Sequence, residues 1–441
     1  MEVVMLIKTI LISLCLFVTS IQAAPKIQHW VTDNGVRIYF FPTHELPMMD
    51  FRVVFDAGAA RDGEKHGLAL LTNGLLAEGA ANWNASEIAE QFEGVGATFS
   101  NSSHRDMAVL SLRSLTDPKL LNVATKAFST VLTAPSFPQK AFDRERNRLL
   151  ISLERQKQSP DSISNKAFYE ALYEKHPYAH LATGDIDSVK SINVNDLKTF
   201  YKKYYVSQNA VVALVGDLTR KQAEALVDQI FKSMGSGVRA PKIAPVPTLS
   251  ENKNVDIFFP STQSHILLGQ PGIKRGDNDY FPLYVANHVL GGSGLVSTLS
   301  DEIREKRGLA YSSYSYFVPM REKGPFIMGL QTKNESAGEA LTVLREVLRK
   351  FVNNGPTQAE LDAAKKNLVG GFALRIASNK KIVENLASIG FYQMPLDYLD
   401  TYIKNIESVT LDQVKNAFKR HINPDKMATV VVGDAKKTQK N

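Results

Sequence analysis

The chain has 441 residues, of which 44% are apolar and 22% are charged, values typical of a globular protein with sizeable cores. This length predicts two domains, or three. The formal net charge is +7, but basic and acidic residues alternate along the chain, and no basic run with interleaved aromatic residues occurs. The composition therefore argues against nucleic-acid binding and favours a solvated surface.

The N-terminus has the layout of a secretory signal peptide. Lys8 precedes an apolar run over 9–18, and small or tolerated residues lead to a predicted cleavage after Ala23. A run this short cannot span about 30 Å of hydrocarbon as a helix, which argues against a membrane anchor. The only cysteine, Cys15, lies in this run. We expect residues 1–23 to be removed and the mature protein, without thiol or membrane span, to be periplasmic.

Two segments repeat at a constant offset of 217 residues. In the first copy, apolar residues with helical spacing over 186–201 lead into the β-branched run 211–217, which ends in Gly-Asp. In the second copy the same pattern covers 403–418 and 428–434. An amphipathic helix followed by a buried strand and its turn is predicted in each copy. The ordered pattern indicates duplication of a domain.

The remaining elements indicate an α+β fold of two homologous domains. Glycines and prolines without periodicity over 235–252 predict a linker, which separates an N-terminal domain over 24–234 from a C-terminal domain over 253–441. Strands and helices come in runs rather than in strict alternation. The clearest are strands over 49–55 and 107–112 and helices over 117–132 and 357–374.

Two motifs carry the functional information. Residues 67–79 read GLALLTNGLLAEG, and residues 291–317 read GGSGLVSTLSDEIREKRGLAYSSYSYF. Together they resemble the pitrilysin/insulinase-type (inverzincin) zinc peptidases of the small two-domain bacterial type, and in particular a metal-free subunit that retains an arginine–tyrosine pair. The resemblance covers nearly the whole mature chain. It implies two α/β-roll domains that pair with a second two-domain subunit around a closed chamber.

The first motif resembles the zinc helix of that family without its chemistry. The resemblance places the family's histidine, glutamate and histidine at Leu70, Asn73 and Gly74, and its third ligand, a glutamate, at Ser152. Zinc hydrolysis needs three protein ligands, an open position for water and a base. None of the four residues can serve as a strong zinc ligand or as the base. We therefore expect no metal or other cofactor in this chain and zinc in a partner subunit with an intact His-x-x-Glu-His motif.

Another compact set of potential ligands is Glu174, His176 and His180. Pro177 prevents a regular helix at this point, so the two histidines do not share a helix face. A similar His-Pro-Tyr segment in the family has no metal role. A structural loop is the favoured interpretation, and His66, just before the degenerate helix, is interpreted as a surface or cap residue.

The second motif predicts a site built from Arg304 and Tyr311. Arg304 lies in the last turn of a predicted helix that ends at Gly308, and Tyr311 opens a predicted strand over 311–317. This reversal can bring both side chains to one side. From the residues alone, an arginine–carboxylate pair beside a half-buried tyrosine is the favoured interpretation. The resemblance favours substrate contact by Arg304 and stabilisation of the oxyanion by the Tyr311 hydroxyl.

Two further segments belong to the predicted peptide chamber. Gly291, Gly292 and Gly294 allow positive φ and close backbone approach, and they predict a flexible loop that borders the substrate. No Lys-Ser/Thr follows them, which argues against a nucleotide loop. The strand predicted over 97–112 resembles the family strand to which substrate adds, with Ser100 at its usual asparagine. A purely structural edge strand is favoured there.

Three functions are compatible with this sequence. The leading hypothesis is a metal-free subunit of a periplasmic heteromeric peptidase, which binds peptide through Arg304 and Tyr311 and is active only with its zinc-bearing partner. The second is an inactive binding or scaffold protein with the same fold. The third, an independent peptidase, lacks any serine, thiol or metal arrangement to support it.

Overall fold

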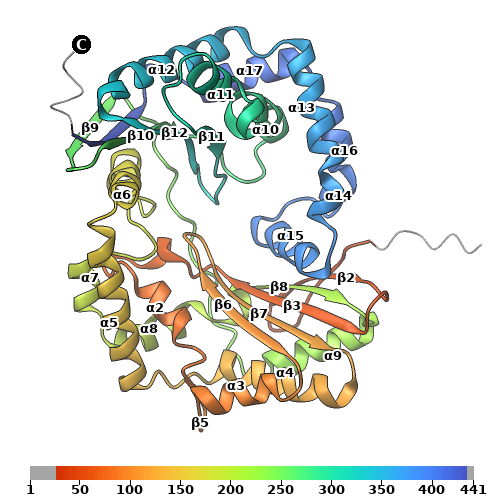
Figure 1. Cartoon of the computed structure of the whole chain (residues 1–441). Helices are drawn as coiled ribbons and strands as arrows, with labels where there is room; N and C mark the ends of the chain where they lie inside the picture. Colours follow the sequence, from red (N-terminus) through yellow and green to blue (C-terminus); the bar gives the residue numbers. More distant parts are fainter. Residues whose placement is uncertain (1–25, 435–441) are drawn as a thin grey trace, which may run out of the picture.

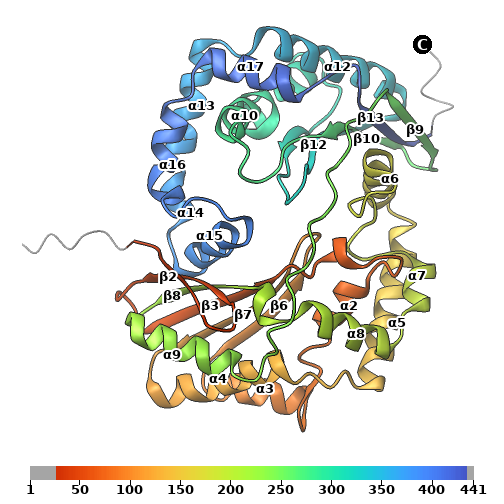
Figure 2. The same ribbon diagram turned by 180° about the vertical axis from the view of Figure 1, so that it is seen from behind.

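The computed structural model describes residues 26–434, so the predicted signal peptide and its cleavage position lie outside the described residues. Within this range the chain forms two halves, each with one mixed β-sheet and helices packed against it (Figure 1). A connecting segment without helix or strand, residues 232–252, runs from one half to the other (Figure 2). This two-part α+β architecture is the fold class that the sequence predicts.

The N-terminal half holds the larger sheet and its covering helices. In chain order it contains β1 (Gln28–Val31), β2 (Arg37–Pro42), β3 (Met48–Phe55), the short η1 (Ala59–Arg61), α2 (Leu68–Gly74), the small pair β4 (Gly79–Ala80) and β5 (Trp83–Asn84), α3 (Ala85–Glu93), β6 (Thr98–Ser103), β7 (Ala108–Leu115), α4 (Pro118–Thr133), α5 (Gln139–Gln156), α6 (Pro160–Tyr173), α7 (Ile186–Ser191), α8 (Val194–Tyr204), η2 (Ser207–Asn209), β8 (Ala210–Gly216) and α9 (Arg220–Phe231).

The C-terminal half repeats this order with more irregular helical turns. It contains β9 (Lys253–Phe258), β10 (Gln263–Pro271), α10 (Tyr280–Asn287), η3 (His288–Gly292), η4 (Gly294–Val296), α11 (Thr298–Ser300), η5 (Asp301–Glu305), β11 (Ser313–Phe317), β12 (Pro325–Lys333), η6 (Asn334–Ser336), α12 (Ala337–Asn354), α13 (Gln358–Gly370), α14 (Phe372–Arg375), α15 (Asn379–Tyr392), α16 (Tyr398–Glu407), α17 (Leu411–His421) and β13 (Ala428–Gly433).

The two sheets share one topology. The larger has the strand order β1-β2-β8-β3-β7-β6, and the smaller has the order β11-β12-β10-β13-β9. Thus β2-β8-β3-β7-β6 corresponds to β9-β13-β10-β12-β11, and the parallel pairs β2/β8 and β9/β13 coincide. Helices α8 and α17 begin with capping boxes at equivalent positions, Asn193 with Asp196 and Thr410 with Gln413. The predicted duplication is confirmed.

The halves exchange one helix each. Helix α6, from the N-terminal half, packs on β10 and β13 of the C-terminal sheet, and α15 packs in the same way on β3 and β8 of the N-terminal sheet (Figure 1). Each contact has its own apolar core: Phe168 of α6 lies with Val430 of β13, and Leu386 of α15 lies with Val211 of β8. These two cores are separate from the main core of each half. The exchange joins the halves through apolar packing.

A buried carboxylate forms a polar joint between the halves. Asp106, in the turn between β6 and β7, is only 3% exposed. It accepts hydrogen bonds from the Tyr178 hydroxyl (2.6 Å), the Arg321 backbone N–H (2.7 Å) and the Tyr392 hydroxyl (3.1 Å). Arg321 precedes β12, and Tyr392 ends α15. One side chain of the N-terminal half therefore holds two segments of the C-terminal half.

Two predicted elements are wrong in extent. The segment 97–112 is a hairpin rather than one strand, because His104 and Met107 close a turn between β6 and β7 with a backbone hydrogen bond of 2.8 Å. The helix predicted over 357–374 is interrupted at Gly371, between α13 and α14. Glycine destabilises a helix interior, which favours an interruption at this position.

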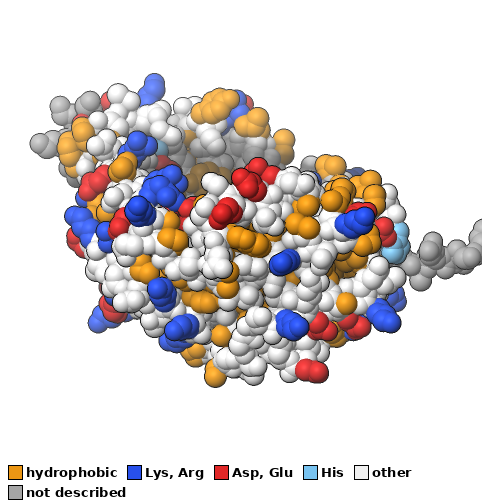
Figure 3. All heavy atoms as spheres, turned by 90° about the horizontal axis from the view of Figure 1, so that it is seen from below, with side chains coloured by type: hydrophobic (Ala, Val, Ile, Leu, Met, Phe, Trp, Pro, Cys, Tyr) orange, Lys and Arg blue, Asp and Glu red, His pale blue; other side chains and the backbone are white. Residues whose placement is uncertain are grey.

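The surface has a mixed character. On the face seen in Figure 3, basic and acidic side chains are interspersed with apolar ones. Among residues 26–434, no helix combines the length and the hydropathy needed to cross a membrane.

Candidate functional site

Helix α2 lies where the sequence places the degenerate zinc helix. It follows Gly67, whose φ of 97° lies in the left-handed region that glycine adopts most easily. The buried Asp62 carboxylate caps the first turn, because it accepts from the backbone N–H groups of Gly67 (2.8 Å) and Ala69 (2.7 Å). Burial raises the pKa of Asp62, and hydrogen bonds from His180 and from these two backbone groups partly oppose that rise. The helix is thus firmly anchored without a metal ligand.

The predicted zinc positions on α2 have taken other roles. Leu70 is half-buried, Asn73 is buried and Gly74 is exposed. The Asn73 amide donates to the Tyr205 hydroxyl (3.2 Å), and its backbone carbonyl accepts from the Asn101 amide (2.6 Å). An amide cannot take a proton from water at neutral pH, so the position of the family's base is occupied by a packing residue.

The third predicted ligand position is also changed. Ser152 lies on the exposed face of α5, where its hydroxyl accepts from Gln156 (3.4 Å). The nearby Glu154 is exposed and pairs with Lys157 (3.3 Å). Helix α5 still packs beside α2. In the described part of the chain, the one group of three potential metal ligands lies in the C-terminal half, away from both helices.

The structure brings Arg304 and Tyr311 together. Arg304 lies in η5, Gly308 reverses the chain with a φ of 62°, and Tyr311 precedes β11. The guanidinium carbon of Arg304 lies 4.8 Å from the centroid of the Tyr311 ring. The predicted reversal is confirmed, although the strand begins at Ser313, two residues later than expected. Whether the pair contacts substrate stays a prediction.

The pair is open to solvent. Tyr311 is 81% exposed, and the Arg304 side chain is 30% exposed. The carboxylate nearest to Arg304 is its neighbour Glu305, at 3.5 Å, a contact that leaves most of the five guanidinium donors free. A cation over an exposed ring contributes about 0.5–1 kcal/mol, enough to orient both side chains without burying them.

The three glycines of the predicted loop differ in their roles. A Cβ on Gly291 would lie 2.4 Å from the backbone nitrogen of Ser315, so the chain passes directly against β11 there. A Cβ on Gly292 would lie 3.0 Å from the Asn287 carbonyl oxygen. Gly294 has a φ of 65° and open space around it. After it, Val296 is 85% exposed.

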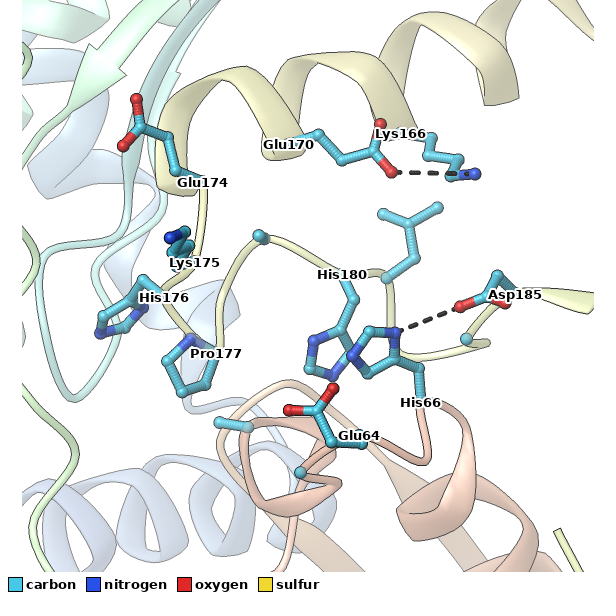
Figure 4. Close-up of a pocket in the computed structure, with 15 residues that line it drawn as sticks. Glu64, His66, Lys166, Glu170, Glu174, Lys175, His176, Pro177, His180 and Asp185 are labelled. Atoms are coloured by element: carbon cyan, nitrogen blue, oxygen red, sulfur yellow. Dashed lines mark hydrogen bonds and ion pairs between the residues drawn. The ribbon is translucent and has the colours of Figure 1, made fainter. Parts of the chain in front are cut away.

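The alternative metal set is held apart by other contacts (Figure 4). His176 uses both ring nitrogens: Nε2 lies 2.8 Å from the Ala244 carbonyl, and Nδ1 accepts from the Tyr178 backbone N–H (3.1 Å). Burial lowers the pKa of His176, in agreement with a neutral ring. Nε2 of His180 contacts the Ala59 carbonyl (2.9 Å), and Glu174 pairs with Lys253. The contacts agree with the interpretation as a structural loop.

His66 is partly exposed and does not cap α2, whose cap is Asp62. Its ring stacks on that of His180 with centroids 4.0 Å apart, and its Nδ1 lies 3.1 Å from Asp185 (Figure 4). The two histidines line a pocket of about 560 Å³ with the lysine and glutamate side chains of α6.

Comparison with known proteins identifies the family. Residues 44–184 match the family model described as insulinase (peptidase family M16), and residues 191–368 match the model described as the peptidase M16 inactive domain. A crystal structure of a peptidase M16 inactive domain from Pseudomonas fluorescens is 41% identical, covers 92% of this chain and 98% of that chain, and has a TM-score of 0.89. The chain belongs to the M16 peptidase family.

Other M16-like relatives match over nearly their whole length. A non-peptidase homolog, YmxG, of Helicobacter pylori is 26% identical and covers 98% of this chain and 99% of its own. An uncharacterized zinc protease, YmxG, of Bacillus subtilis is 23% identical and covers 90% of this chain and 96% of its own. A solved protease structure from Helicobacter pylori, 20% identical with a TM-score of 0.85, shares the fold over 93% of this chain and 100% of that chain.

For this M16 chain, β6 is an edge strand of the larger sheet, as predicted. Ser100 lies on it, beside a small cavity of about 150 Å³. Two ion pairs border this cavity: Arg113 binds Asp50 through two hydrogen bonds of 3.0 Å, and Arg52 lies 3.6 Å from Glu384 of α15. The purely structural role favoured for this edge stays a prediction.

The sequence analysis missed one cluster of potential metal ligands. Asp277, Asp279 and His421 approach one another where α17 ends beside the start of α10. His421 Nε2 lies 2.8 Å from Asp279, but the Arg420 guanidinium also holds both oxygens of that carboxylate, at 2.7 and 3.0 Å. The positive charge of the Arg420 guanidinium on the same carboxylate disfavours binding of a metal cation at this cluster. No spacing signal could reveal the cluster, because His421 lies 142 residues after Asp279 in the sequence.

Proposed function

We propose that this chain is the zinc-free subunit of a periplasmic heteromeric peptidase. In this proposal a homologous subunit with an intact His-x-x-Glu-His motif supplies zinc, its water and the base. This chain supplies Arg304 and Tyr311 to the same peptide. The periplasmic location rests on the predicted signal peptide over residues 1–23, and detection of the mature chain in an osmotic-shock fraction, starting at Ala24, tests it.

The observation that carries the proposal is the Arg304–Tyr311 pair, with its exposed ring, in a chain whose family zinc positions on α2 hold Leu70, Asn73 and Gly74. A pair with a purely structural role would be expected to lie buried or to be paired with a carboxylate from another element. Here the ring is 81% exposed, and the guanidinium lies 4.8 Å from it. Tyr311 is therefore open to a second molecule, and the partly exposed Arg304 side chain lies directly beside it.

The chemistry of the two groups fits peptide hydrolysis on a neighbouring zinc. The Arg304 guanidinium offers donors in a fixed fork to substrate carbonyls. The Tyr311 hydroxyl can donate to the oxyanion that develops at the scissile carbonyl, where one donor contributes about 3 kcal/mol. Neither group can activate water, and Leu70, Asn73 and Gly74 cannot replace the missing ligands and base. Cleavage then requires the partner.

A second candidate is a non-enzymatic peptide-binding or scaffold protein. It is favoured by the change of all four zinc positions and by the name of the Helicobacter pylori relative, a non-peptidase homolog. The two candidates differ in one respect, since only the first requires that Tyr311 changes the rate of a reaction.

The deciding experiment is steady-state kinetics with Tyr311→Phe in the complex with the zinc-bearing homologue. This change keeps the exposed ring and removes the hydroxyl, so kcat should fall on the order of 10² with unchanged stability. Arg304→Ala should raise KM, and Arg349→Ala is a matched control because Arg349 is an exposed arginine paired with Asp425. An intact complex, verified by size-exclusion chromatography, with unchanged kcat and kcat/KM for Tyr311→Phe would support the scaffold instead.

A further inference from the structure

A second cavity lies in the C-terminal half, where the fold repeats the position of the zinc helix. It has a volume of about 520 Å³ and lies between α10, β11 and α13. Its lining includes Gly291 and Gly292 of η3. The side chains that matter for its chemistry are Tyr284, His288, Tyr314, Asn367 and Arg375.

Strand register establishes which residues of the two halves correspond. In the larger sheet Asn101 of β6 faces Leu110 of β7, and in the smaller sheet Ser315 of β11 faces Met328 of β12. The pairing can be followed from β7 through β3 to β8 in the larger sheet, and from β12 through β10 to β13 in the smaller sheet. Because β8 and β13 correspond in the sequence repeat, this register makes Ser315 the counterpart of Asn101. Both residues therefore sit at the same place on equivalent edge strands.

Hydrogen bonds between the edge strand and the helix, although made by different groups in the two halves, then align the helices. Asn101 holds the backbone carbonyl of Asn73, and Ser315 is held by Asn287, whose amide donates to the Ser315 carbonyl (3.0 Å) and whose side-chain oxygen accepts from the Ser315 hydroxyl (2.8 Å). Asn287 on α10 is thus the counterpart of Asn73 on α2. The order of buried and half-buried residues along the two helices agrees with this alignment.

All four degenerate zinc positions correspond to residues of this cavity. Leu70, Asn73 and Gly74 align with Tyr284, Asn287 and His288. Helices α5 and α13 are counterparts, and each begins directly after its N-cap. The first residues of α6 and α15 are separated in sequence by the same number of residues as those of α5 and α13. This constant separation aligns Ser152 with Gly371. The duplicated fold thus places a polar cavity where the family's zinc site lies in the other half.

The charges in the cavity favour an anion. No carboxylate lines it, and Arg375 is its one cationic side chain apart from the histidine. Burial lowers the pKa of His288, which favours the neutral ring. Arg375 bonds to the Tyr284 hydroxyl, lies 5.6 Å from the centroid of that ring, and takes part in none of the ion pairs found among residues 26–434. An oriented guanidinium without a carboxylate partner is suited to a carboxylate ligand.

We propose that this cavity binds a peptide carboxylate, with Arg375 as the cation that holds it. The free C-terminal carboxylate is the expected source, and an aspartate or glutamate side chain offers the same group. Tyr314 follows Tyr311 by three residues, so the two Cα atoms are at most about 11 Å apart. Because Tyr314 lines the cavity, a peptide of about four extended residues is long enough to run from the cavity wall at Tyr314 to Tyr311.

The test measures binding by the isolated full-length mature chain. The probe is a fluorescein-labelled penta-alanine peptide with a free C-terminal carboxylate, compared with its C-terminal amide by fluorescence anisotropy. Arg375→Gln should weaken binding of the free acid by at least about tenfold, as expected for loss of a charge-assisted hydrogen bond. Arg375→Lys should recover part of the affinity, and Arg349→Gln should change nothing.

A third peptide, amidated and with one internal glutamate, separates the two sources. Binding of this peptide with Arg375 dependence assigns the site to side-chain carboxylates, and binding of the free acid alone assigns it to peptide C-termini. Equal binding of the free acid and the plain amide, equal binding by wild type and Arg375→Gln, or no binding at all would overturn the proposal. The inference takes its peptide ligand from the proposed function, but no partner or cleavage enters the assay, so the two can fail separately.

Discussion

Removal of the Asp106 carboxylate should weaken the joint between the two halves more than removal of any exposed acid. Asp106→Ala deletes an acceptor that is 3% exposed and that receives three hydrogen bonds, two of them from segments of the C-terminal half. The Tyr178 hydroxyl and the Arg321 backbone N–H then lose their acceptor at a site with little access to water. The change therefore leaves buried donors unsatisfied.

The expected cost follows from this geometry. Each buried donor left without an acceptor costs about 1–3 kcal/mol, and hydrogen bonds to a charged group contribute about 1.5–3 kcal/mol each. These values are not additive, because the three donors share one carboxylate. Two buried donors left without an acceptor, together with the loss of the third bond, give an expected loss of about 3–5 kcal/mol in the free energy of unfolding. Tyr392→Phe removes only the longest of the three bonds and should cost about 1 kcal/mol.

Urea denaturation followed by circular dichroism measures this loss. Asp228→Ala is the matched control, because Asp228 is exposed on α9 and its removal should change stability by less than about 0.5 kcal/mol. Hydrogen exchange adds a local test, since α15 should lose protection before the main core of the N-terminal half does. If Asp106→Ala behaves like Asp228→Ala in both measurements, the carboxylate does not hold the halves together.

Two further predictions concern metal content and pH. The purified chain should contain no stoichiometric zinc by elemental analysis after dialysis. The double substitution Leu70→His with Gly74→His should restore no cleavage, because Asn73 supplies no base and Ser152 no third ligand. Chelator-sensitive cleavage by the wild-type chain alone would contradict this prediction. Burial raises the pKa of Tyr178 and of other buried tyrosines, so as the pH rises the unfolded state loses its phenol protons before the folded state does. The free energy of unfolding should therefore be steady below about pH 10. Above that pH it should fall by about 1.4 kcal/mol per pH unit for each tyrosine that is still protonated in the folded state. Urea titrations from about pH 8 to about pH 11 measure this, and a stability that stays constant above about pH 10 would refute it.

Much of the fold was predictable because short segments of the sequence carry the apolar spacing of a helix or a strand. The β-branched runs that became β8 and β13 end in Gly-Asp, and the helices before them carry apolar residues at helical spacing. Such periodicities determine which face of an element is buried. The approach of Arg304 to Tyr311 was also predictable, because Gly308 allows the sharp reversal between them.

The limits of prediction have equally local reasons. The sequence predicts one strand where β6 and β7 form a hairpin, because residues 104–107 contain neither glycine nor proline to mark the turn. Helix α13 was extended through Gly371, since the apolar spacing continues past it. The β6–β7 turn is also held from outside the segment, because Asp106 accepts hydrogen bonds from Tyr178, Arg321 and Tyr392.

By itself the sequence determined that this M16 chain has two copies of one domain, because that property depends only on residue type and spacing. The resemblance to the family assigned Leu70, Asn73, Gly74 and Ser152 to the four zinc positions. Only the tertiary structure decided which surfaces meet. Periodicity shows that α6 and α15 each have an apolar face, but not that each packs on the sheet of the other half. The same holds for Asp106 and for the cavity around Arg375, whose neighbours come from distant segments. Apolar burial is non-directional, so the partner of a face is chosen by the packing of the whole chain.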